Sequence, residues 1–188
     1  MNDPIRESSA ADHELAARNV GPLGFAVLTL SDTRTAETDV SGRTIREMIA
    51  AAGHEVARYE VLPDDPPRIR AALVEALADP RVAVVVSNGG TGIAVRDNAY
   101  EVVSALLDKP LVGFGELFRM LSWEQVGAAA MLSRATAGIA RGKVVFALPG
   151  STNAVRLGME KLIVPEAAHL YWELHKEVPQ GATQPKPL

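Results

Sequence analysis

The chain has 188 residues, 47% of them hydrophobic and 22% charged, which favours one soluble globular domain and excludes a disordered or fibrous protein. A formal net charge of −4 argues against a general nucleic-acid or membrane-surface binder, which carries a basic excess. Because the sequence has no cysteine, disulfides, cysteine-bound zinc, iron–sulfur clusters and thiolate nucleophiles are excluded.

The two ends of the chain are predicted to lie outside the folded domain. Residues 1–22 are polar and alanine-rich, and we expect a flexible N-terminal arm there. Residues 178–188 form a proline-rich tail, which leaves the domain at 23–177. The N-terminal segment has no apolar leader, and no stretch approaches the length of a membrane span. We therefore expect a cytoplasmic protein that binds neither membrane nor nucleic acid.

The first half of the domain alternates strands with helices. Residues 23–30 form an apolar run typical of a buried strand, and a helix closed by Gly53 follows from residue 41. Residues 54–62 alternate apolar and polar positions as a second strand, and the Pro66-Pro67 pair opens the next helix. Residues 82–87 are almost entirely valine and alanine, as in a strand covered on both faces.

The second half continues this alternation. Its predicted elements are helices at about 97–107, 114–121 and 123–132, a strand at 143–148, and helices at 152–163 and 166–176. This order predicts a three-layer α/β fold with a mainly parallel sheet and helices on both faces. Ligands bind such sheets at the carboxyl ends of their strands.

Two loops that follow predicted strands are rich in glycine. They are Asn88-Gly89-Gly90-Thr91-Gly92 and Pro149-Gly150-Ser151. Glycine lets backbone N–H groups approach a ligand, and a following helix favours anions, so both loops are candidate phosphate-binding loops. Neither loop matches an established nucleotide motif, and both could equally be tight turns.

Aspartates follow three of the predicted strands. Asp32 follows the first, Asp64 the second and Asp97 the third. Carboxylates beside phosphates repel them unless a cation lies between, and Mg²⁺ held by one or two carboxylates and by phosphate oxygens is the usual solution. Each acid also has a structural interpretation: Asp97 as the N-cap of its helix, Asp64 as an acid before the Pro-Pro helix start, and Asp32 as a turn former.

A third group of polar residues lies later in the chain. Glu116 follows Gly113-Phe114-Gly115 near a predicted helix start, where its charge could bind a ligand or stabilise the helix dipole. Arg134, after Ser133, could hold a phosphate or pair with an acid. The small apolar residues of 126–132 could form a contact between subunits or ordinary core.

Taken together, these residues resemble the MoaB/MogA family of molybdopterin-binding proteins of molybdenum cofactor biosynthesis, and are closer to the MoaB branch. The resemblance covers about residues 23–165. It is carried, in order, by LTLSD (28–32), DVSG (39–42), LPD (62–64), GGTG (89–92), RD (96–97), GFGE (113–116), LSR (132–134) and LPGS (148–151).

The resemblance implies a nucleotidyltransferase that adenylylates molybdopterin with Mg²⁺-ATP and releases pyrophosphate. It implies that Asp64 and Asp97 are the catalytic pair and hold Mg²⁺. The substrate-binding residues it implies are Ser31, Asp32, Asn88, Gly89, Gly90, Thr91, Gly92, Glu116, Ser133, Arg134, Pro149, Gly150 and Ser151. It also implies a homotrimer or a homohexamer.

The sequence departs from the family after Asp97. The family commonly continues with a Thr-Pro-Glu-like segment, whereas this chain has Asn98-Ala99-Tyr100-Glu101. Two other functions therefore stay open beside the enzyme: a carrier that binds molybdopterin without turnover, and an oligomeric assembly module. In the assembly module, Trp123 and Met131 would lie in an interface.

Overall fold

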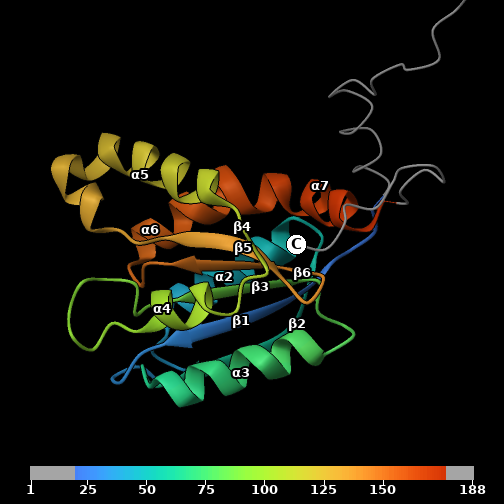
Figure 1. Ribbon diagram of the computed structural model, residues 1–188, viewed down its shortest axis with the longest axis horizontal. Helices are drawn as coiled ribbons and strands as arrows, with labels where there is room; N and C mark the ends of the chain where they lie inside the picture. Colours follow the sequence, from blue (N-terminus) through green and yellow to red (C-terminus); the bar gives the residue numbers. More distant parts are fainter. Residues whose placement is uncertain (1–19, 177–188) are drawn as a thin grey trace, which may run out of the picture.

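Six strands form one sheet in the order β2-β1-β3-β6-β5-β4 (Figure 1). The strands are β1 (Gly24–Leu30), β2 (Glu55–Leu62), β3 (Val84–Asn88), β4 (Lys109–Pro110), β5 (Thr136–Ala140) and β6 (Lys143–Leu148). The first four in this order are parallel, whereas β5 runs antiparallel to β6 and β4 antiparallel to β5. The mainly parallel sheet is confirmed, but β4 and β5 were not predicted from the sequence.

This computed structural model describes residues 20–176. Most of the predicted arm, residues 1–19, and the whole predicted tail, 178–188, lie outside the described residues. Within the described range, no helix combines the length and the hydropathy needed to span a bilayer.

Helices cover both faces of the sheet, as predicted (Figure 1). One face packs against α2 (Val40–Ala51), α5 (Val112–Val126), α6 (Thr152–Gly158) and α7 (Val164–His175). The other face packs against α3 (Pro66–Ala78) and α4 (Ala99–Ser104). The fold is therefore three-layered, with an α/β architecture.

Strand β1 shows why the sequences of the central strands are continuous apolar runs. Phe25 and Val27 pack into the core on the α2 side, while Ala26 and Leu28 pack into the core on the α3 side. Successive side chains of a strand point to opposite faces, so a strand covered on both faces needs apolar residues at every position.

Val85→Ala is expected to lower the free energy of unfolding by roughly 2–3 kcal/mol, because it removes two buried methyl groups and leaves a cavity. Val85 lies on β3 and is 0% exposed, whereas Val95 is 99% exposed. Urea unfolding followed by far-UV circular dichroism measures the change, and Val95→Ala is the matched control. Equal losses in both variants would contradict the burial of β3 between two helical layers.

Several helix boundaries differ from the sequence prediction. The helix predicted from Asp97 begins at Ala99 and ends at Ser104. The two stretches predicted at 114–121 and 123–132 are one helix, α5, followed by a 3₁₀ helix, η1 (Gly127–Leu132). Gly127 adopts φ +58° at this boundary, a left-handed conformation that ends an α-helix.

The last two predicted helices form one continuous helical run. A π-helical segment, η2 (Met159–Ile163), joins α6 to α7. Pro165 lies in the first turn of α7 and lacks a backbone N–H, so one ordinary helical hydrogen bond is missing there. The π-helical turn carries the chain past this position without ending the helix.

The segment 126–132 is not core. Among its residues only Ala130 is buried, whereas Val126 is 57% exposed and Met131 is 77% exposed. The interpretation of this run as ordinary core is therefore wrong.

Candidate functional site

The carboxyl ends of the four parallel strands meet at one edge of the sheet. Leu30 of β1 pairs with Leu62 of β2, and Asn88 of β3 pairs with both Thr29 and Leu148. Because these strand ends are in register, the loops that follow them start side by side. The predicted site residues at 31–32, 64, 89–92 and 149–151 belong to these loops, and Asn88 is the last residue of β3.

A cavity of about 410 Å³ opens beside two of these loops, which we call the glycine loop (Gly89–Gly92) and the proline loop (Pro149–Ser151). Of the predicted site residues, it is lined by Gly89, Gly90, Thr91, Gly92, Asp97, Ser133, Pro149, Gly150 and Ser151. Helix α5 contributes Phe118, Ser122 and Gln125 to its wall, which the sequence did not predict. The fold therefore gathers nine of the predicted residues around one hollow.

The glycine loop needs glycine for its backbone conformation and for the close approach of neighbouring side chains. Gly89 and Gly90 adopt φ values of +107° and +62°, which disfavour any residue with a Cβ. A Cβ on Gly90 would overlap the carboxylate of Asp64, and one on Gly92 would overlap the carboxylate of Asp97. The backbone of this loop thus lies directly against the two acids.

The two loops also touch each other. A Cβ on Gly150 would lie 3.1 Å from the Cα of Gly89, closer than side chains normally approach a backbone. Gly89 is buried and its N–H donates to the carbonyl of Leu148 at 3.0 Å. The glycine and proline loops therefore form one packed unit.

The three predicted aspartates lie close together behind the glycine loop. The backbone N–H of Asp64 donates to Asp32 Oδ1 at 3.3 Å, and the N–H of Asn98 donates to Asp64 Oδ1 at 3.3 Å. Asp97 Oδ2 accepts the N–H of Ala94 at 2.9 Å. Asp32 forms an ion pair with Arg96 across the loops.

The electrostatics of this group centre on Asp64. Burial raises the pKa of the Asp64 carboxyl, and the negative charges of Asp97 and Asp32 raise it further, against the lowering effect of the Asn98 N–H and of Arg96. A carboxylate whose pKa is raised by burial and by neighbouring negative charges is stabilised when a cation binds beside it.

The structure shows which side chains cap the helices near these acids. The N-cap position of α4 is Asn98, and Asp97 accepts its hydrogen bond from within the preceding loop. The cap of α3 is Asp65, which accepts the N–H of Arg68 at 3.3 Å. Asp32 bonds across to the β2–α3 loop, so it does more than form a turn. None of the three predicted acids therefore caps a helix with its side chain.

Arg134 forms the boundary between this cavity and a second one. Its guanidinium donates to the carbonyls of Thr91 (3.0 Å) and Asp97 (3.3 Å), pairs with Glu101, and lies 4.9 Å from the ring centre of Tyr100. The pairing with Arg134 lowers the pKa of Glu101. Of the two predicted alternatives for Arg134, a phosphate contact or an acid pair, the structure shows the acid pair, and Arg134 also holds the glycine loop.

The second cavity has a volume of about 420 Å³ and shares Ser133 with the first. Tyr100, Arg119 and Arg134 line it. The Oγ of Ser133 is buried and has no hydrogen-bond partner among residues 20–176. A ligand that reached between the two cavities would supply that partner.

The remaining predicted residues lie in different positions. Asn88 is buried beneath the glycine loop, and Ser31 accepts the N–H groups of Thr33 and Arg34 at 3.3 Å, which closes a turn. Ser151 caps α6 by accepting the N–H of Ala154. Glu116 is exposed on α5 and lines neither cavity, so the structure does not bring it to the others.

Comparison with known proteins identifies the family and the fold of the chain. Residues 26–169 match the model of the family described as "Probable molybdopterin binding domain". The chain belongs to this molybdopterin-binding family of molybdenum cofactor biosynthesis. It is also similar to individual members of the family, both in sequence and in structure.

Molybdenum cofactor biosynthesis protein B of Bacillus cereus is 53% identical over 152 residues, which cover 80% of this chain and 90% of that protein. A crystal structure of a molybdenum cofactor biosynthesis protein B superposes with a TM-score of 0.81 at 52% identity, covering 83% and 98% of the two chains. The tungsten cofactor synthesizing protein MoaB of Pyrococcus furiosus gives 0.74 at 42% identity, covering 81% and 97%. The expected resemblance to the MoaB branch is confirmed.

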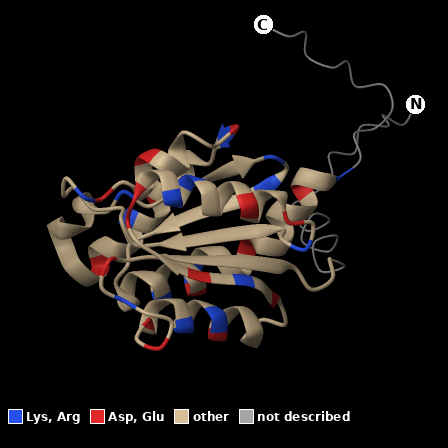
Figure 2. Cartoon of the chain, turned by 90° about the horizontal axis from the view of Figure 1, so that it is seen from below, with Lys and Arg blue, Asp and Glu red and all other residues tan. Residues whose placement is uncertain are grey.

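In this member of the molybdopterin-binding family, the charged residues are not sorted into separate acidic and basic regions. Figure 2 shows acidic and basic residues interspersed over the helices and loops, while the central strands are almost without charge. The site depends instead on how a few charges are paired.

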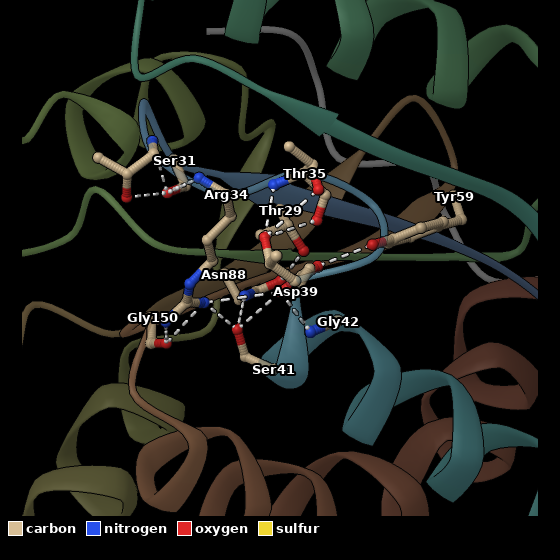
Figure 3. Close-up of polar contacts among 12 residues, drawn as sticks. Thr29, Ser31, Arg34, Thr35, Asp39, Ser41, Gly42, Tyr59, Asn88 and Gly150 are labelled. Carbon is tan, nitrogen blue, oxygen red and sulfur yellow. Dashed lines mark hydrogen bonds and ion pairs between the residues drawn. The ribbon is translucent and has the colours of Figure 1, made fainter.

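One group of paired polar residues was missed by the sequence analysis (Figure 3). It surrounds Asp39, the N-cap of α2, which is 1% exposed. Burial alone would raise the pKa of Asp39, but the nearby hydroxyl of Thr29 and hydrogen bonds from Gly42, Tyr59 and Ser41 outweigh it and lower the pKa, so the group is an anion. Burial and Asp39 together raise the pKa of Tyr59 to about 12.

The site can be tested for its fit to a magnesium ion. Across residues 20–176, no three His, Cys, Asp or Glu side chains are grouped so that they could hold a metal by themselves. Mg²⁺ needs fewer protein ligands, since it is usually held by one or two carboxylates together with phosphate oxygens and water. The carboxylates of Asp64 and Asp97 lie against Gly90 and Gly92 of the glycine loop, and two carboxylates fit that smaller requirement.

Proposed function

We propose that the protein adenylylates molybdopterin with Mg²⁺-ATP and releases pyrophosphate. The observation that carries this proposal is the packing of the glycine loop against Asp64 and Asp97, with the proline loop beside it. Backbone donors that could bind phosphate oxygens thereby lie next to carboxylates that could bind the accompanying cation. Family membership supports molybdopterin as the second substrate.

The reaction transfers an adenylyl group between two phosphates. An oxygen of the terminal phosphate of molybdopterin forms a bond to the α-phosphorus of ATP, and the bond from that phosphorus to the β-phosphate oxygen breaks. The electron pair leaves with pyrophosphate. Such a transfer needs alignment and charge neutralisation, and no protein nucleophile.

In this mechanism each part of the site has a separate task. The glycine and proline loops would bind phosphate oxygens through backbone N–H groups, and Asp64 and Asp97 would hold Mg²⁺, which when bound neutralises phosphate charge. Arg134 would keep the glycine loop in place through the carbonyls of Thr91 and Asp97.

Two cavities that meet at Ser133 support a reaction with two organic substrates. Each is large enough for one heterocyclic group, since ligand sites typically range from about 300 to 1,000 Å³. The phosphates of the two ligands would meet at the glycine loop, which borders one cavity and is fixed by a residue of the other.

A carrier that binds molybdopterin without turnover is the second candidate. It is favoured by the altered segment after Asp97, where Asn98 donates to Asp64 and the N–H of Ala99 donates to the carbonyl of Gly90 at 2.9 Å. Asp64 and Asp97 each already accept a backbone hydrogen bond, so a stable site could persist without the chemistry.

Pyrophosphate release separates the two candidates. Purified protein given molybdopterin, ATP and Mg²⁺ is expected to release pyrophosphate, and the release should require all three. If the protein binds molybdopterin but releases no pyrophosphate, the carrier function replaces the enzyme. If it binds no molybdopterin, the assembly module remains.

We further propose that the protein is a homotrimer or homohexamer that associates through one apolar surface. This surface, the α5 face, comprises Val112, Leu117, Met120, Trp123, Val126, Met131 and Leu132, which are 48–77% exposed. Met131 and Leu132 lie on η1 and the others on α5. Soluble monomers rarely expose so many large apolar side chains on neighbouring elements, and such a face typically marks a contact with another protein.

Trp123→Glu is expected to dissociate the oligomer, because it places a charge in the centre of the α5 face. Trp123 is 62% exposed in the single chain, so the substitution should leave the fold intact. Sedimentation velocity measures the mass, and Val95→Glu, which alters an exposed residue away from α5, is the control. A monomeric wild type, or an unchanged mass in the Trp123 variant, would contradict this assignment.

A further inference from the structure

The carboxylate of Asp39 lies beneath the two loops of the site (Figure 3). It accepts the N–H of Gly42 and the hydroxyl of Tyr59 at 2.9 Å, and the hydroxyl of Ser41 at 3.1 Å. A buried carboxylate with this many donors remains charged, and its charge acts at long range because little water screens it.

Arg34 joins this buried anion to the proline loop. Its Nη1 lies 3.6 Å from Asp39 Oδ1, and the same guanidinium bonds to the hydroxyl of Ser41. Both Nη1 and Nη2 donate to the carbonyl oxygen of Gly150 at 3.3 Å. One planar group therefore fixes the direction of the Gly150 carbonyl relative to α2.

Asn88 joins the same group to the glycine loop. Its Nδ2 donates to the Ser41 hydroxyl at 3.1 Å, and its Oδ1 accepts the hydroxyl of Thr29 at 2.9 Å. Asn88 is the last residue of β3 and directly precedes Gly89. Ser41 thus accepts from Asn88 and from Arg34 and donates to Asp39, so that both loops are held by the start of α2 (Figure 3).

The charge of Asp39 matters because phosphates would bind above it. A carboxylate left without its cation in a low-dielectric site repels other anions and is itself costly to bury. The guanidinium of Arg34, which is 33% exposed, lies in contact with both Asp39 and the proline loop. It can therefore neutralise the carboxylate at the place where a phosphate would otherwise be repelled.

We propose that Arg34 is a positioning residue that orients the proline loop and neutralises Asp39, so that the two loops can hold a phosphate group. This inference rests on the proposed function in one respect, namely that a phosphate-bearing ligand binds at these loops. It assigns no chemical step to Arg34.

A double substitution that removes both the Arg34 and the Asp39 charge tests this role. Arg34→Met is expected to raise the Kd for Mg²⁺-ATP about tenfold or more. The buried carboxylate of Asp39 loses its positively charged partner, and the Gly150 carbonyl loses its hydrogen bonds from Arg34. The double variant Arg34→Met/Asp39→Asn should recover much of that loss, because the repelling charge is gone. Arg34→Lys, which keeps the charge but not the two-nitrogen contact, should fall between wild type and Arg34→Met.

The matched control is Arg58→Met. Arg58 is also a partly buried arginine, 25% exposed, and it pairs with Glu60 and Glu75 away from the loops. Titration calorimetry gives the Kd values, and thermal unfolding shows that each variant is folded. Hydrogen exchange at residues 89–92 and 150–152 should rise in Arg34→Met and stay unchanged in Arg58→Met.

The outcomes also distinguish this inference from the proposed reaction. If Mg²⁺-ATP binds in a manner that depends on Arg34 but no pyrophosphate is released, the proposed adenylylation is refuted and the positioning role of Arg34 is supported. Pyrophosphate release that Arg34→Met leaves unchanged would sink the positioning role alone. A double variant that binds no better than Arg34→Met, or a wild type that does not bind Mg²⁺-ATP, would overturn the inference.

Discussion

Asp97→Ala is expected to lower the rate of pyrophosphate release by about 10²–10³-fold while changing the affinity for molybdopterin less than tenfold. Asp97 lines the cavity beside the glycine loop, and its carboxylate lies where a Cβ of Gly92 would be. Its removal takes away a Mg²⁺ ligand and leaves the backbone donors of both loops in place. Turnover should therefore suffer much more than binding.

Asp97 also accepts the N–H of Ala94, so the loss of that hydrogen bond needs its own control. Asp108 provides one, because it accepts the N–H of Arg141 at 2.7 Å in a turn outside the two cavities. Asp108→Ala should leave pyrophosphate release unchanged, and Asp97→Asn, which keeps an acceptor oxygen, should be nearly as inactive as Asp97→Ala. Equal losses of turnover and molybdopterin affinity in Asp97→Ala would refute this division of tasks.

Much of the site could be predicted because parallel strands end at a common edge. Once residues 23–30, 54–62 and 82–87 were assigned to strands, the residues after them had to lie near one another. That rule alone brought Asp32, Asp64 and the glycine loop together, and the register of β1 with β2 and β3 bears it out.

Strand β5 could not be predicted in the same way. Its sequence, Thr-Ala-Gly-Ile-Ala, is short and contains small residues with little intrinsic preference for a strand. It is a strand because every one of its residues pairs with β6. Such stabilisation comes from tertiary pairing, which a local pattern does not reveal.

The position of Glu116 shows a related limit. The sequence indicated that it lies near the start of a helix, but not which way that helix turns its faces. Phe118 and Ser122 of α5 are buried and line the cavity, whereas Glu116 is exposed. The rotation of α5 about its axis is set by packing against the sheet, so spacing along the chain could not place the side chain.

Of the contacts around Asp39, the helix cap could be predicted from the sequence, but the long-range contact of Arg34 could not. An Asp directly before a predicted helix is a recognisable N-cap, and Asp39 does accept the N–H of Gly42. The contact of Arg34 with Gly150, however, joins residues 116 positions apart. It depends on the two loops packing together, which only the folded chain specifies.

Gly90→Ala is expected to lower Mg²⁺-ATP binding and pyrophosphate release by about 100-fold, an effect of ~3 kcal/mol. The new Cβ would overlap the carboxylate of Asp64, at a position where φ is +62°. Either Asp64 or the loop must move, and both belong to the proposed site. Calorimetry with Mg²⁺-ATP and a pyrophosphate assay measure the two losses.

The backbone strain of an alanine at positive φ must be separated from the displacement of Asp64 or of the loop. Gly142→Ala is the control for strain alone. It adopts φ +74°, but a Cβ there would meet no atom within 4 Å. Both alanine variants should therefore lose about 1–2 kcal/mol of stability, since Ala is disfavoured at positive φ. Only Gly90→Ala should lose ligand binding, because only there does the Cβ displace a carboxylate. If Gly90→Ala binds Mg²⁺-ATP as tightly as Gly142→Ala does, the glycine loop is a tight turn that takes no part in binding phosphate.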